Sequence, residues 1–183
     1  MVLKHTPDVD KEMDLPQFNL PAIDGQNYSR EDVAGDNGTL VVFICNHCPY
    51  VIGIADRLNK ELMAVKKLGI GVIAINANDA MNYPEDSFEK MKPFAKKYGF
   101  EFPYAYDESQ RVAHSFEAIC TPDFFGFNKD GKLRYRGRLD SAGKDSADSQ
   151  TVRELYNAMK EMAKTGDITQ KQTPSMGCSI KWK

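Results

Sequence analysis

Residues 39–51 read Thr-Leu-Val-Val-Phe-Ile-Cys-Asn-His-Cys-Pro-Tyr-Val, and two different patterns meet inside this stretch. The first six residues are apolar or β-branched, which predicts a short buried strand. From Pro49 onward the apolar residues recur at intervals of three and four, which predicts a helix to about residue 68. The two cysteines of the stretch, Cys45 and Cys48, are therefore expected where a strand ends and a helix begins.

The start of a helix is a favourable place for a reactive thiol. Its first backbone N–H groups lack partners, and the helix dipole adds about half a positive charge, so an anion is stabilised there. The pKa of a cysteine in such a position can fall from about 8.5 to roughly 3.5–7.5. We therefore expect Cys45 to be the nucleophile, with the more exposed thiol and the lower pKa. Cys48 is expected to be its more buried resolving partner.

His47 stands between the two cysteines and allows two interpretations. Its cation could stabilise the Cys45 thiolate and make a Cys45–Cys48 disulfide more oxidising. It could instead be a solvated loop histidine without a role in the chemistry. The first interpretation makes His47 a candidate site residue.

The composition limits the class of protein. A chain of 183 residues is long enough to bury one core, and 42% hydrophobic with 27% charged residues is typical of a globular protein. We expect a single domain over residues 1–183, with an N-terminal arm over 1–17 and an irregular C-terminal tail over 166–183. The net charge of −2 gives no reason to expect nucleic acid or an anionic membrane as a partner.

The chain shows no apolar export signal in its first residues and no run long enough to span a bilayer. The expected compartment is therefore the cytoplasm, where thiols are kept mostly reduced. Cysteines in that compartment are more often catalytic, metal-binding or inert than part of structural disulfides.

The rest of the pattern predicts an alternation of strands and helices. Residues 69–76 predict a second buried strand, which would lie parallel to the first because a helix connects them. A proline at position 93 predicts a kink or a break in the next helix. The remaining expected elements are a hairpin over 18–28, a helix over 84–98, a strand at 104–106, a helix to about 118, a hairpin over 123–137 and a helix over 151–164.

This order of elements is that of the thioredoxin-like fold, and Thr121-Pro122 strengthens the resemblance. We therefore expect an α/β protein with a central mixed β-sheet flanked by helices and an N-terminal β-hairpin extension. Thioredoxin-like proteins carry a cis-proline directly before the hairpin strand, in a loop that faces the Cys-x-x-Cys pair. The resemblance implies a cis bond before Pro122 and a place for Thr121 and Pro122 in the active site.

A more specific resemblance covers nearly the whole chain. Residues 18–26 resemble the opening hairpin of the alkyl hydroperoxide reductase/thiol-specific antioxidant (AhpC/TSA, peroxiredoxin) group and of membrane-associated thiol reductases. Residues 45–51, 120–125 and 177–182 are similar to a peroxiredoxin-like branch that carries the motif Cys-Asn-His-Cys-Pro. That motif points to disulfide exchange within this branch.

Two departures separate the chain from the better-known members of these families. Peroxiredoxins place a Pro seven residues and a Thr three residues before the cysteine that attacks peroxide. If Cys48 were that cysteine, these two positions would hold Val41 and Cys45. If Cys45 were, they would hold Gly38 and Val42. Thioredoxins carry a buried Asp, a Trp and a basic residue around the motif, where this chain has Thr39, Ile44 and Pro49. Neither the usual peroxide pocket nor the usual buried carboxylate is expected here.

The sequence therefore predicts a thiol–disulfide oxidoreductase with a Cys45/Cys48 dithiol–disulfide couple and a redox or antioxidant role. The alternative is a thiol-dependent peroxidase that uses the same cysteines. Two weaker alternatives are a non-enzymatic binding module and a metal-binding protein. The expected partners are a disulfide-containing protein or a small thiol or peroxide, with a thioredoxin or glutathione system as reductant. No cofactor and no metal are expected.

Two more cysteines are possible auxiliary thiols. Cys120 is most simply a small buried hydrophobic residue, yet it lies two positions before Pro122 and so near the expected active surface. Cys178 lies in the C-terminal tail. If the tail reaches the active face, Cys178 could resolve an oxidised Cys45 or exchange with the Cys45–Cys48 disulfide.

The tail itself is expected to fold back on the domain. It carries Ile180 and Trp182, and burial of such side chains contributes roughly 1.5–3 kcal/mol each. We therefore expect Trp182 to be largely buried.

Overall fold

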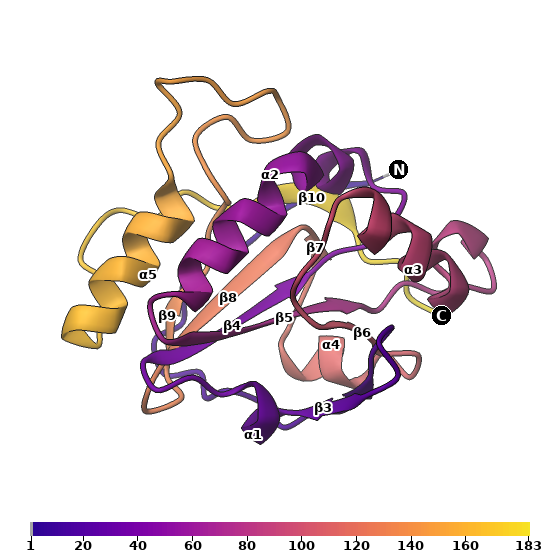
Figure 1. Ribbon diagram of the computed structural model, residues 1–183, viewed down its shortest axis with the longest axis horizontal. Coiled ribbons are helices and arrows are strands. Elements are labelled where there is room, and N and C mark those ends of the chain that lie inside the picture. The colour runs from indigo at the N-terminus through magenta and orange to yellow at the C-terminus, as the bar shows by residue number, and fades with distance from the viewer. Residues whose placement is uncertain (1) are drawn as a thin grey trace.

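A mixed β-sheet runs through the middle of the molecule and is covered by helices on both faces (Figure 1). The computed structural model describes residues 2–183. The central sheet has the order β9–β8–β4–β5–β6, in which β8 is antiparallel to β4 and β9, and β5 is parallel to β6. Its strands are β4 (Gly38–Phe43), β5 (Ile70–Asn76), β6 (Tyr104–Tyr106), β8 (Asp123–Asn128) and β9 (Leu133–Tyr135).

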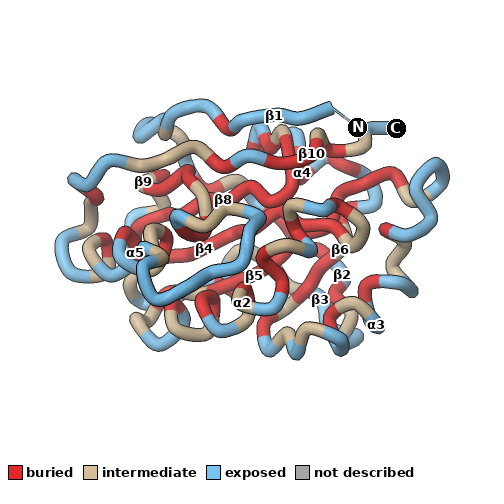
Figure 2. The backbone as a smooth tube through the Cα atoms, turned by 90° about the horizontal axis from the view of Figure 1, so that it is seen from above, coloured by how far each residue is buried: buried red, intermediate tan, exposed pale blue. Residues whose placement is uncertain are grey.

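The two halves of the sheet meet at β4 and β5, where the Ile44 N–H donates a hydrogen bond to the Ile75 carbonyl at 3.0 Å. Side chains of β4 alternate between two cores. Leu40 and Val42 pack on the face of the long helix α2, and Val41 and Phe43 pack on the opposite face. All residues of β4 are buried, as the apolar run predicts, and Figure 2 shows the central strands inside a shell of exposed loops.

The helices divide between the two faces of the sheet. Buried residues of α2, α3 and α5 belong to one core, while those of α1 and α4 belong to the other. The helices are α1 (Arg30–Val33), α2 (Pro49–Lys66), the short 3-10 helix η1 (Pro84–Asp86), α3 (Phe88–Lys97), α4 (Arg111–Ser115) and α5 (Glu154–Thr165).

This is the α/β thioredoxin-like fold that the sequence predicts, with helices on both sides of a central mixed sheet. The expected hairpin is formed by β2 (Asn19–Pro21) and β3 (Asn27–Ser29). One helix differs from the prediction. The expected helix over 84–98 is interrupted at Ser87, between η1 and α3, whereas Pro93 lies inside α3.

The C-terminal tail is a strand rather than an irregular segment. β10 (Met176–Ser179) lies between β1 (Leu3–His5) and β7 (Cys120–Thr121) in a second, antiparallel sheet. The expected irregular tail over 166–183 is thus wrong at its end, and the expected N-terminal arm contributes one of the flanking strands. The tail does fold back on the domain, as predicted.

Trp182 is less buried than predicted. Ile180 is 3% exposed and belongs to the core, but Trp182 is 39% exposed and stacks on the His114 ring with 4.1 Å between ring centres. One face of the indole is therefore covered by a polar ring at the surface.

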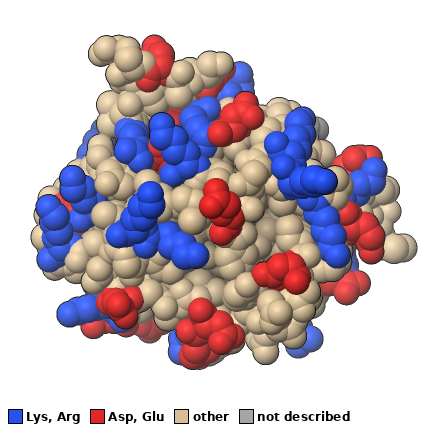
Figure 3. Space-filling view, viewed as in Figure 1, with Lys and Arg blue, Asp and Glu red and all other residues tan. Residues whose placement is uncertain are grey.

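The surface carries charges of both signs. In the face shown in Figure 3, Lys and Arg side chains are interspersed with Asp and Glu, which agrees with the small net charge. Among residues 2–183, no helix has both the length and the apolar character needed to cross a bilayer.

Candidate active site

The predicted site residues come together at one end of the central sheet. Cys45, His47 and Cys48 lie in the connection between β4 and α2, and Thr121 approaches them from β7. The Thr121 Oγ1 atom lies 3.3 Å from Cys45 Sγ, and the Thr121 carbonyl oxygen lies 3.2 Å from Cys48 Sγ. The bond between Thr121 and Pro122 is cis, as the resemblance implies.

A buried ion pair holds the loop that carries Thr121 and Pro122. Asp123 follows Pro122, and its Oδ2 atom accepts hydrogen bonds from Arg136 at 3.1 Å and from the Ile119 N–H at 3.3 Å. Both side chains are almost completely buried. Burial raises the pKa of Asp123 to about 6, although the charge of Arg136 acts in the opposite direction.

The helix begins one residue after Cys48, so the expected order of the two thiol pKa values needs correction. Cys48 is the N-cap of α2, and Cys45 lies three residues further from the helix. Both are buried, with exposed fractions of 1% for Cys45 and 0% for Cys48. The prediction that Cys45 has the lower pKa is therefore wrong, while the exposed fractions of the two buried thiols do not separate them.

The thiolate of the pair is favoured on Cys48. A hydrogen bond from the Cys45 thiol lowers the pKa of Cys48 to about 5, and bonds from the Cys178 thiol and the Val51 N–H act in the same direction. Burial raises the pKa of Cys45, and its hydrogen bond with Cys48 and the negative charge of Asp86 raise it further. The pair thus holds one negative charge, on the sulfur with the most donors.

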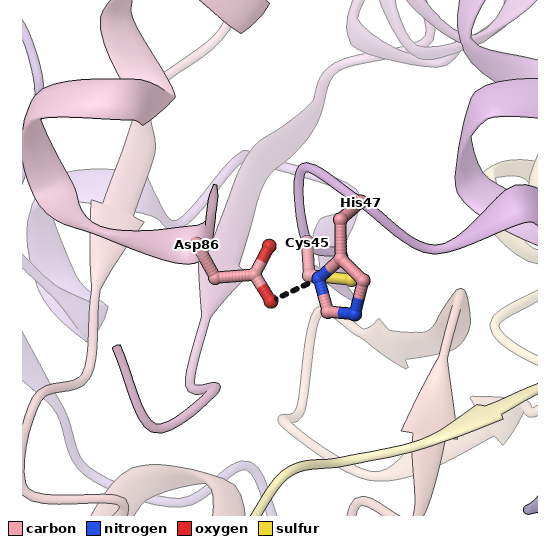
Figure 4. Close-up of side chains that lie close together, drawn as sticks. All are labelled: Cys45, His47 and Asp86. Carbon is pink, nitrogen blue, oxygen red and sulfur yellow. Dashed lines mark hydrogen bonds and ion pairs between the residues drawn. The ribbon is translucent and has the colours of Figure 1, made fainter. Parts of the chain in front are cut away.

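Asp86 is a site residue that the sequence analysis missed. Its Oδ2 atom lies 2.6 Å from His47 Nδ1, and Figure 4 shows the carboxylate directed at the imidazole, with Cys45 behind the ring. The Asp86 side chain is fully buried and also accepts hydrogen bonds from the Asn46 N–H at 2.8 Å and from Asn78 Nδ2 at 2.7 Å. His47 is further held by stacking on Tyr83, with 5.7 Å between ring centres.

A weak signal for this site is present in the sequence. Asn76 ends β5, Asn78 and Asp79 follow it, and the cysteine motif follows β4, so these polar residues and the motif lie at the same edge of the sheet. Polar side chains after two neighbouring parallel strands indicate a site at that edge. Asp86 itself gives no such signal, because it reaches His47 from a 3-10 helix 39 residues away.

Cys45, His47 and Asp86 offer ligand atoms that all lie within 4.8 Å of one another. This donor set is one that zinc accepts. However, two ligand atoms on one tetrahedral zinc lie about 3.3 Å apart, whereas His47 Nδ1 and Asp86 Oδ2 are 2.6 Å apart. The arrangement is that of a hydrogen-bonded pair beside a thiol.

The structure brings one of the two auxiliary cysteines to the pair. Cys178 Sγ on β10 lies 2.7 Å from Cys48 Sγ. Cys120 is buried next to the pair, but its Sγ contacts the Pro122 carbonyl oxygen at 3.6 Å. Burial and the charge of Asp123 raise the pKa of Cys120 far above its ordinary value.

An apolar cleft of about 250 Å³ adjoins the site on the Pro122 side. Its lining includes Tyr50, two residues after Cys48. The lining residues with apolar side chains include Tyr50, Ile54, Pro122, Leu139 and Met176, and those with basic side chains are His5, Arg138 and Lys144.

Three comparisons relate the chain to known proteins. It is similar to the crystal structure of an uncharacterised conserved protein from Geobacillus kaustophilus, with 40% identity, a TM-score of 0.92, and coverage of 100% of this chain and 97% of that one. The structure is also similar to that of a secreted disulfide oxidoreductase of Mycobacterium tuberculosis, homologous to DsbE, with 15% identity and a TM-score of 0.60. The match covers 79% of this chain and 96% of that one, and at this identity it supports a shared fold only.

A curated relative, the thiol-disulfide oxidoreductase ResA of Bacillus anthracis, is 24% identical over 120 residues. The match covers 66% of this chain and 65% of the relative, so it spans slightly less than two thirds of that protein. Residues 12–136 match the AhpC/TSA family, which is the family that the sequence resembles, while the branch with the Cys-Asn-His-Cys-Pro motif remains a prediction. With more than half of its length matched, this chain belongs to the AhpC/TSA family.

Proposed function

We propose that this protein is a thiol–disulfide oxidoreductase in which Cys45 and Cys48 form the dithiol–disulfide couple. The observation that carries the proposal is the pair itself. Two thiols share a hydrogen bond at the start of α2, and the pKa of one of them is lowered to about 5. A thiolate that persists at neutral pH is the species that attacks a disulfide.

Cys45 is proposed as the sulfur that attacks the substrate. Cys48 Sγ contacts Cys178 Sγ and the Thr121 carbonyl oxygen at the start of α2, whereas Cys45 lies beside His47, whose side chain is partly exposed. Transfer of a proton along the hydrogen bond from Cys45 to Cys48 gives the Cys45 thiolate. This thiolate attacks one sulfur of the substrate disulfide, forms a mixed disulfide and releases the other sulfur as a thiolate, which takes up a proton.

Cys48 then resolves the mixed disulfide. Cys48 gives up its proton and attacks Cys45 Sγ, and the second substrate sulfur leaves and is protonated. The products are two substrate thiols and the Cys45–Cys48 disulfide. Asp86 fixes the orientation of the His47 ring beside Cys45 through Nδ1.

The proposed substrates are disulfides in polypeptides. The cleft beside Pro122 has the apolar lining that accepts a side chain next to the scissile disulfide. The names of the relatives are consistent with this class, since ResA is named a thiol-disulfide oxidoreductase. A thioredoxin or glutathione system as reductant, an antioxidant role and a cytoplasmic location remain predictions from the sequence.

Membership of the AhpC/TSA family favours a second candidate, peroxide reduction. In that reaction a cysteine thiolate attacks one peroxide oxygen, becomes a sulfenic acid and releases hydroxide. The positions at which peroxiredoxins carry the Pro and the Thr of the peroxide pocket hold other residues in this chain, so the first candidate is preferred.

The two candidates are separated by measuring rates with insulin and with hydrogen peroxide side by side on the reduced protein. We expect reduction of insulin to be faster, and to be lost in both Cys45→Ser and Cys48→Ser. Cys120→Ser is the matched control, because it removes a neighbouring buried thiol outside the pair. A rate with peroxide that exceeds the rate with insulin would replace the first candidate by the second.

A further inference from the structure

Strand β10 delivers a third thiol to the cysteine pair. Cys178 lies opposite Thr121 in the β10–β7 ladder, and Thr121 is the residue that contacts both Cys45 and Cys48. As a result, Cys178 Sγ lies 2.7 Å from Cys48 Sγ, although 130 residues separate the two cysteines in sequence. Cys48 therefore lies in contact with a thiol on each side, Cys45 and Cys178.

Backbone pairing on both edges of β10 holds Cys178 in contact with Cys48. β1 pairs with the other edge of β10, with Leu3 opposite Cys178. Gly177 allows the close approach of β10 to β7, since a Cβ atom there would lie 2.1 Å from the Thr121 carbonyl oxygen. Beyond the strand, the Ile180 N–H donates to the Ile119 carbonyl at 3.2 Å.

The tail is also tied to the polar side of the active site. The Lys181 N–H donates to Asn78 Oδ1 at 2.9 Å, and Asn78 also donates to Asp86. Gln110 Nε2 donates to the Lys181 carbonyl at 2.8 Å. Cys178 is thus held on a strand whose position depends on residues of the site.

We infer that Cys178 is a third redox thiol, which takes over the disulfide from the Cys45–Cys48 pair to form a Cys48–Cys178 disulfide. The inference rests on the proposed function. In the step, Cys178 loses its proton and its thiolate attacks Cys48 Sγ of the Cys45–Cys48 disulfide. The Cys48–Cys178 bond forms, the Cys45–Cys48 bond breaks, and Cys45 leaves as a thiolate and takes up a proton. One disulfide is present before and after, so no further oxidant is required.

The exchange would return Cys45 to its reduced state while the protein still carries a disulfide. Cys45 would then be a free thiol that can attack a second substrate, and the disulfide would join Cys48 at the start of α2 to Cys178 on β10. Cys120 cannot replace Cys178 in this role from its observed position, because it lies opposite Ser179 and its sulfur contacts the Pro122 carbonyl.

The test is a map of disulfides after oxidation with diamide, alkylation of the remaining thiols and digestion with trypsin. The peptides separate the cysteines well. Cys45 and Cys48 fall on peptide 31–57, Cys120 on 112–129 and Cys178 on 172–181. A link between peptides 31–57 and 172–181 therefore reports directly on Cys178.

We expect Cys45→Ser to form this link, because Cys48 and Cys178 remain in contact. Cys48→Ser and Cys178→Ser should reduce its yield by about ten-fold or more, whereas Cys120→Ser should leave it in place. In the wild-type protein, the disulfide within peptide 31–57 should form first, and the link to 172–181 should grow at its expense.

Absence of the link in Cys45→Ser, with a normal circular dichroism spectrum, would overturn the inference. If the wild-type protein in that case still reduced insulin and formed the Cys45–Cys48 disulfide, the proposed function would stand without the third thiol. Conversely, if the wild-type protein failed to reduce insulin, the proposed function would fail. The presence or absence of the link in Cys45→Ser would then still decide whether Cys178 forms a disulfide with Cys48.

Discussion

The Asp86 carboxylate lies 2.6 Å from His47 Nδ1 and is completely buried, so the imidazole beside Cys45 has a fixed orientation. The sequence contains no acidic residue at the position where thioredoxins bury one, and Thr39 stands there instead. Here a carboxylate reaches the thiols from η1, on the other side of the cysteine loop. A buried carboxylate beside Cys45 is thus supplied by a different part of the chain.

Replacement of Asp86 by Asn tests the effect of this charge on Cys45. The negative charge of Asp86 raises the pKa of Cys45, so its removal should shift the alkylation of Cys45 to lower pH by about one pH unit. The measurement is the rate of iodoacetamide labelling of peptide 31–57 against pH in a Cys48→Ser background. Asp56→Asn, an exposed carboxylate on α2, is the control and should leave the profile unchanged. A profile unaffected by Asp86→Asn would remove Asp86 from the set of residues that tune Cys45.

The ionisation of the pair gives a second prediction. The pKa of Cys48 is lowered to about 5, so the reduced protein should hold one thiolate at neutral pH and lose it as the pH falls through about 5. The ultraviolet absorbance of the thiolate should follow this transition. Cys48→Ser should abolish it, and Cys120→Ser should retain it. A midpoint near the ordinary thiol value of about 8.5 would contradict the arrangement of donors around Cys48.

Trapping of the mixed disulfide distinguishes the attacking sulfur from the resolving one. Cys48→Ser should accumulate a covalent complex with a disulfide substrate, because Cys45 can attack but nothing at position 48 can resolve the product. Cys45→Ser should yield at least about ten-fold less of this complex. Non-reducing gel electrophoresis with a scrambled protein substrate provides the measurement. A complex that forms only in Cys45→Ser would make Cys48 the nucleophile, as its lower pKa alone would suggest.

Gly177→Ala tests whether the close approach of β10 to β7 positions the third thiol. The added Cβ would lie 2.1 Å from the Thr121 carbonyl oxygen, so the strands must separate. We expect a loss of about 1–3 kcal/mol in the free energy of unfolding, measured by urea denaturation, together with a lower yield of the Cys48–Cys178 link. Met176→Ala, on the same strand with a partly exposed side chain, is the control for stability. If Gly177→Ala left the yield of the Cys48–Cys178 disulfide unchanged, the contact between these two cysteines would not depend on the close approach of β10 to β7.

Local patterns predicted the centre of this fold well. The run of apolar residues in β4 and the three-and-four spacing in α2 are properties of neighbouring residues, and both elements lie close to their expected limits. The order of the remaining elements then indicated the thioredoxin-like arrangement.

Features that depend on distant partners could not be predicted in the same way. β10 is a four-residue strand without a clear alternation, and it exists because β1 and β7 pair with both of its edges. Trp182 is held by stacking on His114 rather than by burial, so an argument from apolar area alone overestimated its burial. The reversed order of the thiol pKa values follows from the hydrogen bond that Cys45 donates to Cys48, with a further one from Cys178, which is 130 residues away in sequence.

The pairing of β1 with β10 has a practical consequence for work with this protein. Because Leu3 lies opposite Cys178, the first and the last strand of this chain pair within one small sheet that borders the thiols. A purification tag fused to either end would emerge close to the active site, where a histidine-rich peptide could bind metal ions or obstruct a substrate. Redox measurements are therefore best made after proteolytic removal of any tag.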